Sequence, residues 1–278
     1  MKIGVFPPYG DDHQRNMEFC RDAGVGYIGI YSRSVPGPEE LLELKRKYAE
    51  AGVNFSVLLP PLITTEALID ERLRRSETGT LRRIIVNMGE AGVEILHLYV
   101  SSVHAPSSAE EREVFMRRLI EYYRRIVEQA ESSQVKIATH PYNAPCRLVS
   151  NYETLSSILE AVPSEYNGVL LCTGKTQLAG DDTCETIRKF GSKIFLVHAR
   201  NVAGDYQPGA YETLDERRLE VRFDAGDVDL VTVFKTLKEV GFSGPVFPEH
   251  FPPIVGDRIA GLSWTIGYLK ALEASLQV

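Results

Sequence analysis

The sequence predicts an α/β protein with a (β/α)8 barrel, or TIM barrel, in a single domain that spans residues 1–278. Two observations support this fold class. Short runs rich in β-branched and aromatic residues alternate with longer helical stretches, which is typical of repeated βα units with a parallel sheet. There are eight such runs, and 278 residues is a usual length for this barrel.

The eight strands are expected at residues 2–6, 27–31, 54–59, 94–100, 136–140, 168–173, 193–201 and 245–250. An open doubly wound sheet is the alternative, because it is built from the same units. Such a sheet usually carries a Gly-rich phosphate loop after its first strand, and the segment GVFPPYGDD is not one. The pattern therefore favours the barrel.

Helices are expected at residues 38–51, 80–91, 109–131, 228–240 and 257–275. Glycines follow the last turn of several of them, for example Gly52 and Gly92, as is usual where a helix ends. Two connections between elements are long. The polar stretch 202–227 is predicted to be a loop insertion that covers an active site, and the stretch 60–79 a second loop over the same face.

Composition narrows the function. The net charge of −7 and the lack of a Lys/Arg block argue against a nucleic-acid partner. No apolar run approaches the roughly 18 residues of a membrane span, and the N-terminus resembles a strand rather than a signal segment. The four cysteines form no disulfide framework and no CxxC pair. We therefore expect a cytoplasmic protein without membrane contact, acting on a small molecule, and a homodimer or higher homo-oligomer because barrels with exposed helices commonly pair.

Four side chains that can bind metals occupy the ends of the last four predicted strands: His140, Cys172, His198 and Glu249. In a barrel, chemistry takes place at the C-terminal ends of the strands. Each residue alone also fits an ordinary role in a core or at the surface. Their occurrence at four successive strand ends instead predicts one divalent metal site, and the mixture of thiol, imidazole and carboxylate suits Mn²⁺, Zn²⁺, Co²⁺ or Fe²⁺.

Three further residues are candidates for work on a substrate. Arg200 lies two positions after His198, on the same face of the strand, and its planar fork suits a carboxylate. His250 follows Glu249 and is predicted to carry a proton near neutral pH. Lys175, in the segment CTGKT, is a weaker candidate for substrate contact. A structural ion pair for Arg200 and an ordinary loop position for His250 are the alternatives.

The stretches LLCTGK, IFLVHARNV, FDAGDVDL and PEHFP, with the closing GLSWTIGYLKAL, resemble the C-terminal half of mannonate dehydratases of the hexuronate-degrading type. That family is a TIM barrel related to xylose isomerase, and the resemblance covers residues 136–272. It implies that His140, Cys172, His198 and Glu249 are the ligands of a divalent metal, with Mn²⁺ as the first expectation. It also implies hexuronate catabolism by dehydration of D-mannonate to 2-keto-3-deoxygluconate, with His250 in proton transfer and Arg200 stabilising negative charge.

The chain departs from this family pattern near the expected substrate. Two acidic residues of the family are replaced by Tyr142 and Asn143, which we expect to contact the substrate together with Arg200 and Lys175. A catalytic tyrosine of the family aligns with Ser263, and the usual Asp ligand is Glu249. Two alternatives to a hydro-lyase follow: a xylose isomerase-like sugar isomerase or epimerase, against which Cys172 argues, and a non-catalytic sugar-acid binding relative.

Overall fold

Parallel strands and helices alternate along most of the chain, as the sequence predicts. The computed structural model describes residues 1–32, 34–60, 63–64, 66–101, 106–141, 148–207 and 219–276. Its strands are β1 (Lys2–Val5), β2 (Tyr27–Tyr31), β3 (Asn54–Leu59), β4 (Ile63–Thr64), β5 (Ile95–Ser101), β6 (Lys136–His140), β7 (Asn167–Cys172), β8 (Ile194–Ala199) and β9 (Pro245–Pro248). Each of the eight expected runs contains a strand, and the two-residue β4 is an addition.

The helices are α1 (His13–Asp22), α2 (Pro38–Glu50), α3 (Glu66–Ile69), α4 (Glu71–Ala91), α5 (Ala109–Ser133), α6 (Tyr152–Ala161), α7 (Thr173–Ala179), α8 (Thr183–Phe190), α9 (Leu230–Glu239) and α10 (Arg258–Ser275), with a 3-10 turn η1 (Gly191–Lys193). Side chains that cap the first turn begin several of them, for example Asp70 before α4 and Asp257 before α10. Gly92 has a φ of 69° and ends α4 in the left-handed conformation, as the sequence predicts.

The predicted loop over 60–79 is wrong in its second half, because α4 already begins at Glu71. The Asp70 carboxylate accepts hydrogen bonds from the backbone N–H groups of Arg72 and Leu73, which starts the helix eight residues before Gly79. Within the predicted loop 202–227, the described residues 202–207 and 219–227 contain no helix, and their one β-bridge joins Val202 to Glu220. Residues 208–218 lie outside the described part of the chain.

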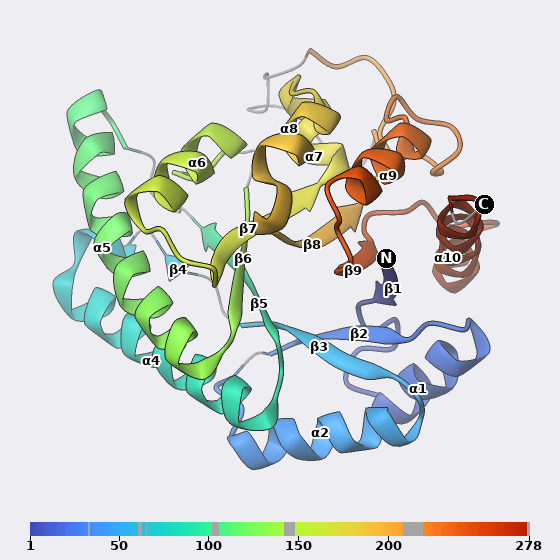
Figure 1. The fold of residues 1–278 in the computed structure, drawn as a ribbon, viewed down its shortest axis with the longest axis horizontal. Coiled ribbons are helices and arrows are strands. Elements are labelled where there is room, and N and C mark those ends of the chain that lie inside the picture. The colour runs from blue at the N-terminus through green and yellow to red at the C-terminus, as the bar shows by residue number, and fades with distance from the viewer. Residues whose placement is uncertain are drawn as a thin grey trace. The chain divides into compact units, whose positions relative to one another are not determined.

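Internal contacts divide the chain into two compact units, and the single domain stays a prediction. The first unit comprises Met1–Gly29, Tyr48–Phe55 and Leu171–Val278, and the second comprises Ile30–Lys47 and Ser56–Leu170. In the second unit β5 pairs in parallel with β3, β4 and β6, and β6 pairs with β7. Figure 1 shows α4 and α5 side by side in this unit.

In the first unit, β1 pairs in parallel with β2 and β9, and β9 pairs with β8. The register sets His198 beside Phe247 and Ala199 beside Pro248. The next residue, Glu249, donates its backbone N–H to the carbonyl of Ala199 at 3.0 Å. Glu249 is therefore held beside the end of β8, near the predicted site residues His198 and Arg200. Among the described residues, no helix is long and apolar enough to cross a membrane.

The ring of Phe247 fills the space above two glycines of the first unit. Phe247 is fully buried, and its ring meets Phe6 edge to face with centroids 5.1 Å apart. A Cβ atom at Gly4 would overlap the Phe247 ring, and a Cβ atom at Gly29 would come within 2.8 Å of it. Glycine on the neighbouring strands β1 and β2 thus makes room for this aromatic side chain.

Gly4→Ala is expected to destabilise the protein by about 1–3 kcal/mol, because the new methyl group forces the buried Phe247 ring to move. Urea unfolding measures the change. Gly26→Ala is the matched control, since nothing lies within 4 Å of its added Cβ atom. Equal unfolding free energies for the two variants would contradict this packing.

Candidate metal centre

Cys172 is the last residue of β7 and precedes α7 directly, so a buried strand delivers its thiol to the strand end. The side chain is fully buried, and its Sγ lies 3.7 Å from Oε2 of Glu249. Burial raises the pKa of the Cys172 thiol to about 12; the Glu249 carboxylate adds to the rise, and Arg200 and Lys175 oppose it. The thiol is therefore protonated at neutral pH unless a cation replaces its proton.

His198 approaches the same carboxylate from β8. Its ring is fully buried, and Nδ1 lies 3.1 Å from Oε2 of Glu249, whose side chain is 17% exposed. One carboxylate oxygen is thus close to both an imidazole nitrogen and a thiol sulfur. Ligand atoms bound to one ion at about 2.0 to 2.3 Å lie roughly 3 to 4 Å from each other, so each of these two distances from Glu249 is in the range for two ligands of one ion.

The first unit therefore brings together three of the four predicted ligands. His140, the fourth, is the last residue of β6 in the second unit and is almost fully buried. Its Nδ1 lies 2.5 Å from the carbonyl oxygen of Pro141. Because a carbonyl only accepts, Nδ1 is the donor in this bond, and the neutral ring then has its lone pair on Nε2, as in a metal-binding imidazole with an outer hydrogen bond.

Arg200 follows β8 directly and is held from several sides within the first unit. Its side chain is fully buried, and Nη2 lies 3.3 Å from Oε1 of Glu220. The hydroxyl of Thr173 donates to the carbonyl of Arg200 at 2.6 Å and accepts from its N–H at 2.9 Å. A Cβ atom at Gly174 would lie 2.7 Å from Cδ of Arg200, so the arginine stem packs directly on the α7 backbone.

His250 is more exposed than the predicted ligands and Arg200, with 43% of its side chain accessible. Its backbone φ of 52° is in the left-handed region, which is uncommon for a residue with a large side chain. Nδ1 lies 3.0 Å from Oε1 of Glu220, and Nε2 lies 3.5 Å from Oε1 of Glu249. His250 therefore sits between two carboxylates, one of them a predicted ligand.

Sequence reasoning missed Glu220, which contacts both Arg200 and His250. Nothing in the sequence singles it out except its place in the long connection after β8. Lys175, a predicted substrate contact, lies buried in α7. Its backbone N–H donates a hydrogen bond to the sulfur of Cys172. Tyr142 and Asn143 lie outside the described residues.

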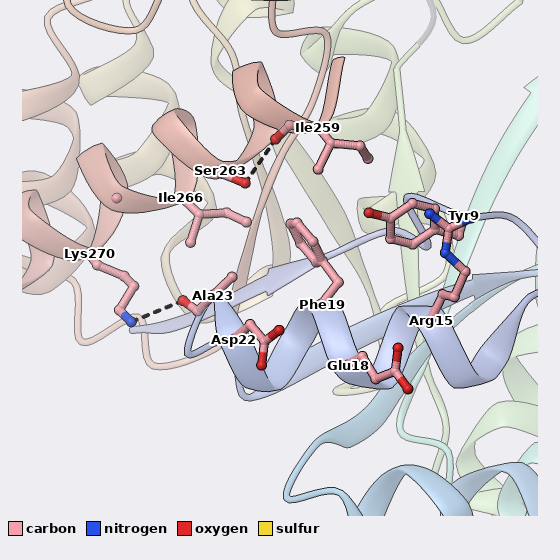
Figure 2. A pocket seen from close by; sticks show the side chains of 11 residues that line it. Tyr9, Arg15, Glu18, Phe19, Asp22, Ala23, Ile259, Ser263, Ile266 and Lys270 are labelled. Atoms are coloured by element: carbon pink, nitrogen blue, oxygen red, sulfur yellow. Dashed lines mark hydrogen bonds between the residues drawn. The ribbon is translucent and has the colours of Figure 1, made fainter. Parts of the chain in front are cut away.

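A separate hollow of about 680 Å³ lies between α1 and α10 in the first unit. Figure 2 shows Phe19 and Ile266 among its apolar lining, with Lys270 donating to the carbonyl of Ala23. Ser263, for which the resemblance predicts the place of a catalytic tyrosine, lines this hollow, and its hydroxyl donates to the carbonyl of Ile259 at 2.8 Å. None of the predicted ligands lines the hollow, so Ser263 belongs to different surroundings from theirs.

A family model described as the xylose isomerase-like TIM barrel matches residues 17–272. The chain belongs to this family. The fold class predicted from the alternation of strands and helices is therefore confirmed, and the doubly wound alternative is wrong. For a barrel of this family, the C-terminal strand ends that carry Cys172, His198 and Glu249 are the usual place of chemistry.

The chain is similar to the mannonate dehydratase of Thermotoga neapolitana, with 28% identity over 182 residues, which cover 59% of this chain and 49% of that protein. The chain thus spans about half the length of the curated relatives it matches.

Two solved structures share the fold across nearly the whole chain. The mannonate dehydratase from Streptococcus suis serotype 2 superimposes with a TM-score of 0.80 and 21% identity, over 99% of this chain and 93% of that one. The IOLI protein with a bound zinc atom superimposes with a TM-score of 0.78 and 18% identity, over 99% of both chains. At these identities the structures establish the fold of this family alone.

Proposed function

We propose that this protein is a metal-dependent sugar-acid dehydratase that acts on D-mannonate or a near relative and releases water and a 2-keto-3-deoxy sugar acid. The observation that carries the proposal is the contact of Glu249 with both Cys172 and His198 in the first unit, beside the buried Arg200. The mannonate dehydratases among the relatives support the same reaction class.

The metal ligands in this proposal are Cys172, His198, Glu249 and His140. His140 stays the predicted fourth ligand, because it ends a strand as Cys172 does and its Nδ1 faces the carbonyl oxygen of Pro141, which leaves Nε2 as the ring atom for an ion. The donor set suits Mn²⁺, with Zn²⁺, Co²⁺ or Fe²⁺ as alternatives. When bound, the ion would polarise substrate oxygens and stabilise negative charge.

Arg200 would hold the substrate carboxylate. Removal of the proton α to a carboxylate builds negative charge on that group, and a buried guanidinium stabilises such charge more strongly than an exposed one. Guanidinium has five N–H donors in a planar fork, so Arg200 can contact Glu220 and a substrate carboxylate together. The bonds from Thr173 and the packing on Gly174 fix the place from which the fork acts.

His250 would give a proton to the departing 3-hydroxyl group. Its imidazole is accessible to solvent while two carboxylates fix its position, which suits a group that must be reprotonated after each turnover. Lys175, Tyr142 and Asn143 stay predicted substrate contacts. A place in cytoplasmic hexuronate catabolism and a homo-oligomeric state likewise stay predictions.

A sugar isomerase or epimerase of the same fold is the alternative function, and epimerases occur among the solved structures with this fold. Their identities of 15–16% extend the likeness to the fold alone. The buried thiol beside Glu249 favours the dehydratase, because isomerases of this class usually bind their metals through carboxylates and histidine.

The reaction is tested by loading the protein with Mn²⁺ and incubating it with a panel of aldonic acids, including D-mannonate, while assaying 2-keto-3-deoxy products. We expect such a product from at least one acid, and a loss of about 10²- to 10⁴-fold in kcat for His250→Gln with metal retained. Epimers or ketoses from neutral sugars, without any keto-deoxy acid, would establish the alternative. No turnover of any substrate by metal-loaded protein would indicate a binding relative.

Metal loading is tested separately by elemental analysis after dialysis against Mn²⁺ or Zn²⁺. Cys172→Ala and His198→Ala are each expected to reduce bound metal sharply, because each removes a buried donor. Cys184→Ala is the matched control, since Cys184 lies in the first turn of α8 and its side chain is only partly buried. Wild-type stoichiometry in both ligand variants would rule out the site.

A further inference from the structure

Glu220 links the two side chains that the proposed function assigns to the substrate. Its Oε1 lies 3.3 Å from Nη2 of Arg200 and 3.0 Å from Nδ1 of His250, and its side chain is only 12% exposed. All three residues belong to the first unit. A single carboxylate oxygen therefore contacts a buried cation and the exposed imidazole at the same time.

The backbone on both sides of Glu220 is fixed to the end of β8. An antiparallel bridge joins Glu220 to Val202, and Ala203 donates its N–H to the carbonyl of Leu219 at 2.9 Å. Val221 donates to the carbonyl of Asn201 at 3.3 Å. The carboxylate of Glu220 is thus carried by a paired segment rather than by an open loop.

The side chain of Asn201 closes the far side of the same segment. It is almost fully buried, donates to the carbonyls of Phe223 and Val228 at 2.9 and 3.1 Å, and accepts from the N–H of Val228 at 2.9 Å. A Cβ atom at Gly226 would overlap Asn201, so the chain turns closely around this amide. The segment that follows Glu220 therefore returns to the strand end it started from.

The Glu220 carboxylate lies on the Nδ1 side of the His250 ring, 3.0 Å away, while Nε2 lies 3.5 Å from Oε1 of Glu249. The ring is 43% exposed on a left-handed backbone, and these two carboxylates flank it. A carboxylate beside one ring nitrogen can orient a histidine for work at the other nitrogen.

We propose that Glu220 is a positioning residue of the proposed reaction, which orients the ring of His250 and the fork of Arg200. This inference rests on the proposed function for the roles of Arg200 and His250. Glu220 does not bind the metal and does not touch the reacting atoms. It acts by making one orientation of each partner dominant before the substrate arrives.

The variant Glu220→Gln tests this role, because it keeps the size of the side chain and removes its charge and its purely accepting character. We expect kcat to fall about 10- to 100-fold, as for other groups that orient a site residue, with KM changed by less than kcat. Metal content is expected to stay at the wild-type level. Asp224→Asn is the matched control, since it removes one charge from the same segment at an exposed ion pair with Arg222.

Nitrogen-15 NMR of histidine-labelled, zinc-loaded protein tests the contact with His250 without any turnover. The Nδ1 resonance of His250 is expected to shift in Glu220→Gln, because the amide removes the charge beside that nitrogen, and to keep its wild-type position in Asp224→Asn. If no sugar acid is a substrate, the proposed function fails while this spectrum still decides the role of Glu220. An unchanged His250 Nδ1 resonance in Glu220→Gln would overturn the inference.

A purely structural role is distinguished by a second variant. Glu220→Asp keeps the charge and withdraws the carboxylate by one methylene, so its kcat is expected between those of the wild type and Glu220→Gln, with unchanged metal content. Loss of metal or of cooperative unfolding in both variants would assign Glu220 to the fold and overturn the positioning role. Wild-type kcat and KM in Glu220→Gln would overturn it as well.

Discussion

The contact of the Glu249 carboxylate with Cys172 and His198 is the interaction on which the arrangement of the site depends. A thiol and an imidazole, both fully buried at strand ends, are costly unless polar or charged partners compensate them. Glu249 provides that partner, and the register of β8 and β9 places it there by a backbone hydrogen bond. A cation shared by the three groups would remove the proton from the thiol and balance the carboxylate.

Arg200 and Glu220 form a second charge balance next to the first. A fully buried guanidinium without a counter-charge would be strongly destabilising, and truncating one partner of such a pair costs several kcal/mol. Glu220 supplies the counter-charge to Arg200, and the same carboxylate also contacts His250. The site therefore contains two linked groups of charges: one that suits a metal, and one that orients the side chains proposed to act on the substrate.

The sequence predicts the fold and much of the site because both depend on local patterns. Buried β-branched runs mark the strands, and in a parallel arrangement the residues at their ends are brought together without further information, as for Cys172, His198 and Glu249. The sequence does not predict the start of α4, since Gly79 inside a charged stretch resembles a helix break. A glycine inside a long helix, however, lowers its stability by only about 1 kcal/mol relative to alanine.

Glu220 could not be predicted for a different reason. Its segment has neither helical nor strand periodicity, and its position depends on the bridge to Val202 and on the amide of Asn201, which are contacts between distant residues. The chemical identity of the substrate depends on similar contacts. Positions 142 and 143, the predicted substrate contacts, lie outside the described residues.

X-ray absorption at the zinc edge of the zinc-loaded protein tests the central claim most directly, because it reports the ligands of the ion without requiring turnover. The account predicts one sulfur ligand at about 2.3 Å together with nitrogen and oxygen ligands at about 2.0 to 2.2 Å, and loss of the sulfur signal in Cys172→Ala. A shell of nitrogen and oxygen alone in the wild type would contradict it, since the thiol of Cys172 would then lie outside the metal centre.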